Sequence, residues 1–203
     1  MLDRDIQTLL RSPFVQEINF SVSRGTVIVS GPGFLALSNH LSDDYIPQKL
    51  WVRPTPGLIG PRSEAIYNSG QDTLRVRSNT VLHTPFGRGV VVHECTHAQI
   101  DLRGMNTPLP SNEAAAYIAE AWYHLACVQD IAAIAPELLA VIVPIATDLR
   151  ARSKQAGGAV VELTPEQVNQ ARRAMVDHFQ VAARDSVLGN GIGRGRGSIY
   201  REP

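Results

Sequence analysis

The sequence predicts an α+β fold in which a β-rich N-terminal part precedes a series of helices. Short segments of alternating apolar and polar residues, separated by turn residues, occupy the first 80 positions of the chain. From Thr84 onward the apolar residues recur with the period of a helix. Strands that come first and helices that follow are typical of an α+β domain.

The composition is that of a globular protein. Of the 203 residues, 44% are hydrophobic and 19% are charged, which is enough apolar material for a core without disulfides. The 19 basic and 19 acidic side chains cancel, and this balance argues against nucleic acid or an anionic membrane as the main partner. Cys95 and Cys127 do not form a CxxC pair, so no disulfide framework is expected.

The sequence contains no segment that resembles a membrane span or a secretory signal. The N-terminus carries charges of both signs, and the longest nearly uncharged run, residues 131–146, is shorter than a bilayer span and contains two prolines. We interpret that run as part of a buried helix. A soluble protein is expected, cytoplasmic by default, with export by a signal-independent route left open.

Two hairpins are expected in the β-rich part. Residues 19–29 alternate around an Arg-Gly pair, and a short apolar run at 50–52 precedes a loop rich in proline and glycine. Residues 65–67 and 73–77 flank a polar turn, which predicts the second hairpin. Apolar and arginine side chains alternate in 73–77, as in a strand with one solvated face.

The first expected helix begins at Thr84-Pro85, where a hydroxyl can cap the helix and proline fits the first turn, and it ends before Gly104. Further helices are expected at about residues 111–127, 136–153 and 165–185, the last capped by Thr164. Residues 189–203 are rich in glycine and arginine and are expected to be a flexible tail, which leaves 1–188 as a single domain.

The first helix carries the motif His93-Glu94-Cys95-Thr96-His97. Histidines four positions apart lie on one helix face, so both imidazoles can bind one metal ion, and Glu94 can take a proton from a water on that metal. An apolar stripe that includes Cys95 lies on the opposite side of the helix. We therefore expect Cys95 to be a core residue and the histidine face to point into a cleft.

A catalytic zinc ion needs a third protein ligand, with the fourth position left to water. A histidine at position 103 would be one solution, but the sequence has Arg103 there. The second helix offers Glu113 and Glu120, which share a polar stripe with Tyr117 and His124. Since the connecting loop is long enough to deliver either carboxylate, spacing alone leaves both open.

The HExxH motif followed by Asn112-Glu113-Ala114 resembles the gluzincins, the thermolysin-like zinc peptidases, in which a second helix with such a triplet supplies the third ligand. The resemblance covers about 30 residues. It implies a zincin-like fold, a Zn2+ ion bound by His93, His97 and Glu113, and Glu94 as the general base.

Two features depart from the gluzincin pattern. The gap between His97 and Glu113 is shorter than in the thermolysin-like enzymes, and Tyr117 stands where they often have an aspartate that orients the first histidine. Asp101, one turn beyond His97, is the residue that we expect to orient a histidine instead.

The implied function is zinc-dependent hydrolysis of peptide bonds in a protein or peptide substrate. The metal activates a water and polarises the carbonyl, and Glu94 carries the proton from the water to the leaving amine. The oxyanion needs a further donor, and the candidates are His124, Tyr117 and Tyr67, in that order. Residues 73–77 are placed to offer a strand edge to an extended peptide, or else form an ordinary edge strand with protective arginines.

Two alternatives to a general peptidase are a non-catalytic zincin-like binding module and a toxin or effector protease domain that acts on one protein. Peptide turnover that a chelator abolishes would separate the enzyme from the binding module. The histidines at 40, 83 and 178 have no partner in sequence and are expected to lie outside the site. The sequence does not determine the oligomeric state.

Overall fold

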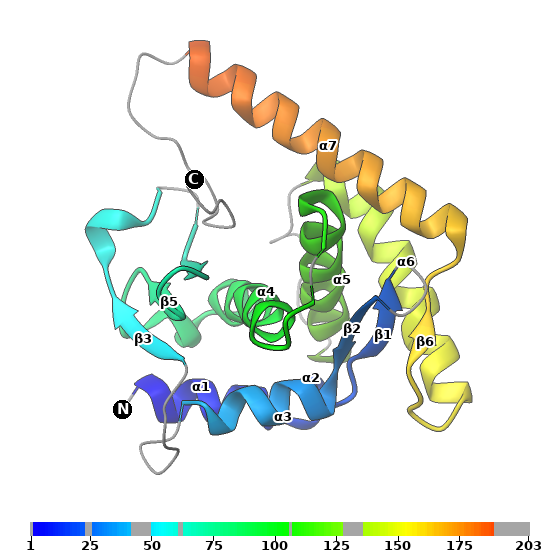
Figure 1. The fold of residues 1–203 in the computed structure, drawn as a ribbon, viewed down its shortest axis with the longest axis horizontal. Coiled ribbons are helices and arrows are strands. Elements are labelled where there is room, and N and C mark those ends of the chain that lie inside the picture. The colour runs from blue at the N-terminus through cyan, green and yellow to red at the C-terminus, as the bar shows by residue number, and fades with distance from the viewer. Residues whose placement is uncertain are drawn as a thin grey trace.

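The structure is a computed structural model that describes residues 2–22, 26–41, 50–60, 63–105, 107–127 and 136–188. It is a mixed α+β arrangement, as predicted (Figure 1). The helices are α1 (Leu2–Leu10), α2 (Pro13–Gln16), α3 (Gly31–Asn39), α4 (Pro85–Leu102), α5 (Leu109–Cys127), α6 (Pro136–Gln155) and α7 (Pro165–Leu188), with 3-10 turns at Pro56–Leu58 and Val81–His83. The strands are β1 (Asn19–Val22), β2 (Val27–Ser30), β3 (Trp51–Pro54), β4 (Ala65–Asn68), β5 (Thr73–Val76) and β6 (Val161–Glu162).

Both predicted hairpins are present, each within a three-stranded sheet. β1 and β2 pair antiparallel, and β6 adds to β1 in parallel, which gives the order β2-β1-β6. β4 and β5 pair antiparallel, and β3 adds to β5 in parallel, which gives the order β3-β5-β4. The parallel partners come from distant parts of the chain, and local alternation carries no signal for them.

The position of β5 corrects the expectation for residues 73–77. β5 is the central strand of its sheet, because β3 covers one edge and β4 the other. It therefore has no free edge for a peptide among these strands, and the edge strand β4 packs against α4.

The N-terminal part contains three helices that the sequence analysis missed. In α1 the residues Leu2, Ile6, Leu9 and Leu10 are buried, at the spacing of one helix face. α3 begins at Gly31, with Ser30 as its cap: the Ser30 hydroxyl accepts a hydrogen bond from the Gly33 amide. The prediction of a β-rich N-terminal part overlooked the helical period of α1 and the capping Ser30 before α3.

α4 and α5 pack against each other at the centre of the molecule (Figure 1). The Thr84 hydroxyl accepts a hydrogen bond from the Gly87 amide, and Gly104 has a φ of +65°, so the predicted cap and stop of α4 are confirmed. The apolar back of α4 is buried, and Cys95 has no exposed surface, as expected. Contacts with α2, α4, α6, α7 and β2 surround α5.

The two C-terminal helices also match their predictions. α6 begins at Pro136, and the part of the uncharged run before it, residues 131–135, lies outside the described residues. Thr164 caps α7 reciprocally with Gln167, each side chain accepting a hydrogen bond from the other residue's amide. The expected tail at 189–203 lies outside the described residues. None of the helices in the described part of the chain has the length and hydropathy that a membrane span needs.

Candidate metal centre

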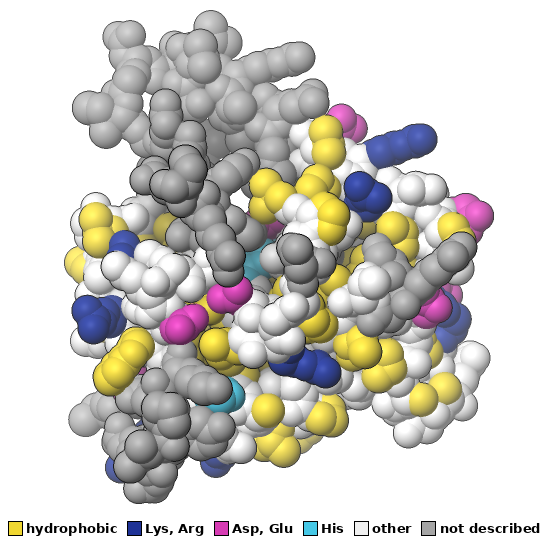
Figure 2. Space-filling model, in the orientation of Figure 1, with side chains coloured by type: hydrophobic (Ala, Val, Ile, Leu, Met, Phe, Trp, Pro, Cys, Tyr) yellow, Lys and Arg dark blue, Asp and Glu magenta, His cyan; other side chains and the backbone are white. Residues whose placement is uncertain are grey.

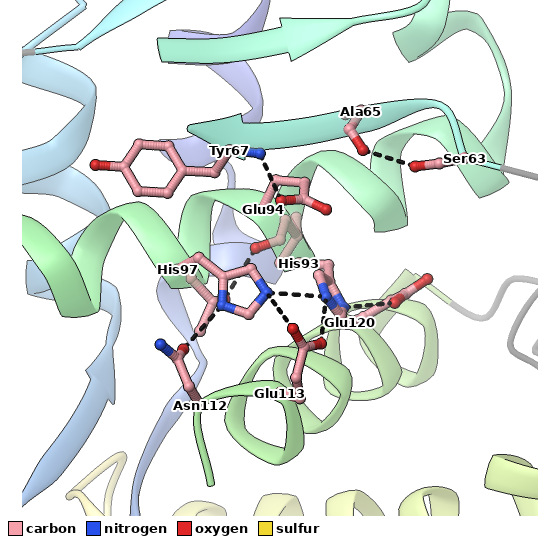
Figure 3. Close-up of polar contacts among 11 residues, drawn as sticks. Ser63, Ala65, Tyr67, His93, Glu94, His97, Asn112, Glu113 and Glu120 are labelled. Atoms are coloured by element: carbon pink, nitrogen blue, oxygen red, sulfur yellow. Dashed lines mark hydrogen bonds and ion pairs between the residues drawn. The ribbon is translucent and has the colours of Figure 1, made fainter. Parts of the chain in front are cut away.

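Three buried side chains from α4 and α5 converge on one point: His93, His97 and Glu113 (Figure 3). The Nε2 atoms of the two histidines are 3.1 Å apart. One carboxylate oxygen of Glu113 lies 3.5 Å from His93 Nε2, and the other lies 3.7 Å from His97 Nε2. In the space-filling view a histidine side chain is visible in a recess near the centre of the face, with acidic side chains beside it (Figure 2).

These distances fit a zinc ion. Zinc binds imidazole nitrogen and carboxylate oxygen at about 2.0–2.1 Å in tetrahedral sites, which separates the ligand atoms by about 3.3 Å. The two nitrogens, 3.1 Å apart, are close to that value, and one oxygen of Glu113 lies 3.5 Å from His93 Nε2 while the other lies 3.7 Å from His97 Nε2. Two histidines and a glutamate leave one position of the tetrahedron open, which is the ligand set of a catalytic rather than a structural zinc site. Of the two glutamates that spacing allowed, Glu113 is the one in the ligand group.

Asn112 orients His97. Its side-chain oxygen lies 2.8 Å from His97 Nδ1, so this nitrogen carries the proton and donates it to the amide oxygen. Burial lowers the pKa of His97, which keeps the imidazole neutral. A neutral imidazole protonated at Nδ1 presents the lone pair of Nε2 to the centre.

Glu120 orients His93. Its carboxylate oxygen lies 3.2 Å from His93 Nδ1 and accepts the proton of that nitrogen. The second glutamate that spacing allowed therefore orients His93, and Asp101 does not have the orienting role that we expected. Partners of this kind fix ring orientation and raise the basicity of metal-binding histidines.

Without a cation, the centre holds two ring nitrogens that face each other. Two lone pairs at 3.1 Å repel each other unless a proton or a metal lies between them. Burial lowers the pKa of His93, but its contacts with Glu113 and Glu120 raise it more, and the net value is about 10. The two carboxylates therefore favour a proton on His93 in the metal-free protein, at the place where a metal would bind.

Zinc binding should release about one proton per ion at pH 8, because His93 must lose its proton to become a ligand. Affinity for zinc should rise about tenfold per pH unit from about pH 7 towards the His93 pKa of about 10. In the metal-free protein the charged imidazole stabilises the fold below pH 6.5, and that contribution is lost as the pH rises to about 10. Calorimetric titration in buffers of different ionisation enthalpy measures the released protons, and a value of zero at pH 8 would contradict the assignment.

Glu94 lies next to the ligand group, between α4 and β4. Its carboxylate accepts a hydrogen bond of 2.7 Å from the backbone amide of Tyr67 (Figure 3). Burial raises the pKa of Glu94, the charge of His93 lowers it, and the result is about 7. A carboxylate with a pKa near neutrality can both accept and return a proton.

The Tyr67 hydroxyl is engaged elsewhere, so the structure does not support it as an oxyanion donor. It donates to Asp101 at 2.9 Å and lies 3.2 Å from a carboxylate oxygen of Asp72. In Figure 3 the ring of Tyr67 extends away from Glu94. Asp101 thus binds Tyr67 rather than a histidine, and it fixes the strand whose amide holds Glu94.

His124 lies behind the centre and has no exposed surface. Its Nε2 atom is 4.0 Å from the carboxylate of Glu120, on the far side of that glutamate from His93. A side chain in this position supports Glu120 and cannot contact a substrate. His124, the first of the three candidates for the oxyanion donor, therefore does not lie where that role requires.

Tyr117 and His178 lie beside the centre and are only partly buried. The ring of Tyr117 is 4.5 Å from that of His93, edge to face, and 6.3 Å from that of His178 on α7. The charge of His178 also helps to lower the pKa of Glu113, which places this histidine near the ligand group. We expected His178 to lie outside the site, because nothing in its local sequence indicates that α7 crosses α5.

The Gly89→Ala substitution should destabilise the fold by about 1–3 kcal/mol. A Cβ atom at Gly89 would lie 2.1 Å from His124 Nε2 and 2.8 Å from its Cε1, and the His124 ring is fully buried. This clash exceeds the roughly 1 kcal/mol that alanine gains over glycine in a helix. Urea unfolding measures the change in free energy.

Gly57→Ala is the matched control, because a Cβ atom there meets nothing within 4 Å. If Gly89→Ala unfolds at the same urea concentration as the original protein, the tight packing of His124 against α4 is wrong.

The comparisons with known proteins return nothing: no family model, no curated protein and no solved structure matches the chain. The candidate function therefore rests on the chemistry of the site.

Proposed function

We propose that the protein is a zinc-dependent metallopeptidase with a zincin-like domain over residues 1–188, in which His93, His97 and Glu113 bind the metal. The convergence of the two Nε2 atoms and the Glu113 carboxylate carries this proposal. The neighbouring Glu94, with a pKa of about 7, supplies the proton-transfer group that hydrolysis needs. The resemblance to the gluzincins points to the same four residues.

In this proposal a bound zinc ion supplies a Lewis acid that polarises the substrate carbonyl and acidifies a water molecule. Glu94 accepts the proton of the attacking water and later delivers it to the leaving amine. The Tyr67 amide holds the Glu94 carboxylate at 2.7 Å while this happens. Asn112 and Glu120 hold the two imidazoles so that their Nε2 atoms stay directed at the centre.

Tyr117 and His178 are the donors that we propose for the oxyanion. Tyr117 lies beside His93, His178 lies beside Tyr117, and both side chains are only partly buried. Tyr117→Phe should lower kcat about 100-fold with little change in KM, because the hydroxyl acts only in the transition state. Steady-state kinetics on the zinc-loaded variant measure this, and an unchanged kcat would remove Tyr117 from the mechanism.

An extended substrate would lie along β4, the strand nearest Glu94. Two groups of this strand are already engaged: the Tyr67 amide by Glu94, and the Ala65 carbonyl by the hydroxyl of Ser63 (Figure 3). The Ala65 carbonyl can accept a second hydrogen bond, so a substrate amide can pair with it beside the Ser63 hydroxyl.

The test is hydrolysis of a broad peptide library by the purified protein. We expect cleavage that stops when a chelator removes the metal and returns when zinc is added back. Zinc binding without cleavage of any peptide would instead support the non-catalytic binding module.

A further inference from the structure

A cavity of about 270 Å³ lies where α7 meets the first turn of α5. In Figure 1, α7 passes across one end of α5, and the lining residue Pro110 shows that this is the end at which α5 begins. The cavity has one wall from α5 and a second wall from one face of α7, since its α7 residues are spaced by three and four positions. The lining residues are Pro110, Asn169, Arg172, Arg173, Val176 and Asp177.

The cavity, which we call the arginine groove, has more positive than negative side chains in its lining. Neither Arg172 nor Arg173 forms an ion pair with any residue of the described chain. Asp177 also lines the groove, but it lies in no ion pair with either guanidinium. Two guanidinium groups against one carboxylate leave a net positive charge, and guanidinium groups pair with carboxylates through charge-assisted hydrogen bonds.

The arginine groove adjoins the metal centre along both helices. On α5, Pro110 precedes the ligand Glu113 by three residues, which is about 4.5 Å along the helix axis. On α7, Val176 and Asp177 directly precede His178, whose ring lies 6.3 Å from that of Tyr117. An extended peptide advances about 3.3 Å per residue, so a residue one to three positions from the scissile bond can reach the groove.

The groove is open along its α7 wall, because Arg172, Arg173, Val176 and Asp177 are all exposed. An open groove lets a peptide chain continue past it, whereas recognition of a chain end needs a wall that stops the chain. The lining therefore suits a side-chain carboxylate better than a terminal one.

We propose that the arginine groove is a specificity site that binds an aspartate or glutamate side chain of the peptide substrate, within three residues of the cleaved bond. This inference rests on the proposed peptidase function. It assigns the site a preference for acidic substrates that neither the HExxH motif nor the ligand set implies.

The test uses a proteome-derived peptide library blocked at both termini, with the zinc-loaded protein and cleavage sites read by mass spectrometry. The original protein should enrich Asp and Glu at one position within three residues of the cleaved bond. R172Q/R173Q should lose this enrichment, and R172E/R173E should enrich Lys and Arg at the same position. For the best acidic peptide, kcat/KM should fall about tenfold in R172Q/R173Q, while the same peptide with Gln in place of the acid is unaffected.

The matched control is R4Q/R53Q, which removes the same charge from two exposed arginines on α1 and β3. This variant should keep both the specificity and the zinc content of the original protein. Equal zinc content in all variants excludes unfolding as the cause of a change.

Two results would overturn the proposed specificity site and leave the peptidase function intact. One is cleavage without enrichment of acidic residues, and the other is an enrichment that R172Q/R173Q retains. Cleavage confined to a parallel library with free C-termini would overturn it in favour of terminal-carboxylate recognition. If the zinc-loaded protein cleaves no peptide in either library, the proposed function fails and the specificity site fails with it.

Discussion

Glu94→Gln should reduce peptide hydrolysis by a factor of about 10²–10⁴ and leave the bound zinc in place. Glu94 is outside the ligand group, so its replacement removes no metal contact. Glutamine keeps the shape of the side chain, and its amide oxygen can still accept the hydrogen bond from the Tyr67 amide. What it cannot do is take a proton from water, so the loss appears in kcat.

Zinc content and kinetics should be measured on the same preparation of Glu94→Gln. Full zinc with residual activity below about 1% is the expected result. A variant that keeps both zinc and full activity would exclude Glu94 as the proton-transfer group and end the proposed mechanism. A variant that loses its zinc would show that Glu94 has a role in holding the metal.

Glu113→Ala should abolish stoichiometric zinc binding, whereas Glu120→Ala should keep it with an affinity lower by a factor of about 10–100. The structure places Glu113 within 3.7 Å of both Nε2 atoms, while Glu120 contacts only the opposite nitrogen of His93, at 3.2 Å. The first substitution removes a ligand, and the second removes the group that orients one. Competition with a chromogenic chelator measures both affinities.

Glu166→Ala, at an exposed glutamate in the first turn of α7, is the control and should bind zinc like the original protein. The opposite ranking, with zinc lost by Glu120→Ala and kept by Glu113→Ala, would reassign the third ligand.

The parts of the molecule that the sequence predicted correctly are those with local signals. The four helices from α4 onward follow from caps, glycine stops and apolar periodicity, and the two hairpins follow from alternation around polar turns. The convergence of His93 and His97 follows from four-residue spacing on one helix. The position of Glu113 needed the fold, because spacing alone also allowed Glu120.

The parts that the sequence did not predict depend on contacts between distant segments. The parallel pairing of β3 with β5 joins strands 22 residues apart in register, and it makes β5 central instead of an edge. Asn112 contacts His97 because α4 and α5 pack together, and His178 lies near the centre because α7 packs against α5. The role of Asn112 in orienting His97 had a signal in the sequence, because Asn112 directly precedes Glu113 in the first turn of α5. The sequence analysis assigned that role to Asp101 instead.

His124 illustrates a different error. It shares a polar stripe with Glu113, Tyr117 and Glu120, and the stripe was interpreted as one functional surface. The structure divides it by depth: Glu113 and Tyr117 face the centre, and His124 is fully buried behind Glu120. Helical periodicity tells which residues share a face, but the depth of each residue on that face depends on the helices packed against it.

The number of zinc ions per chain tests the central claim most directly. Atomic emission spectroscopy on the purified protein, before and after dialysis against a chelator and again after zinc is restored, gives this number. The account predicts one zinc ion per chain, none after chelation and one again after reconstitution. No bound zinc even after reconstitution would contradict the metal centre and, with it, the proposed peptidase.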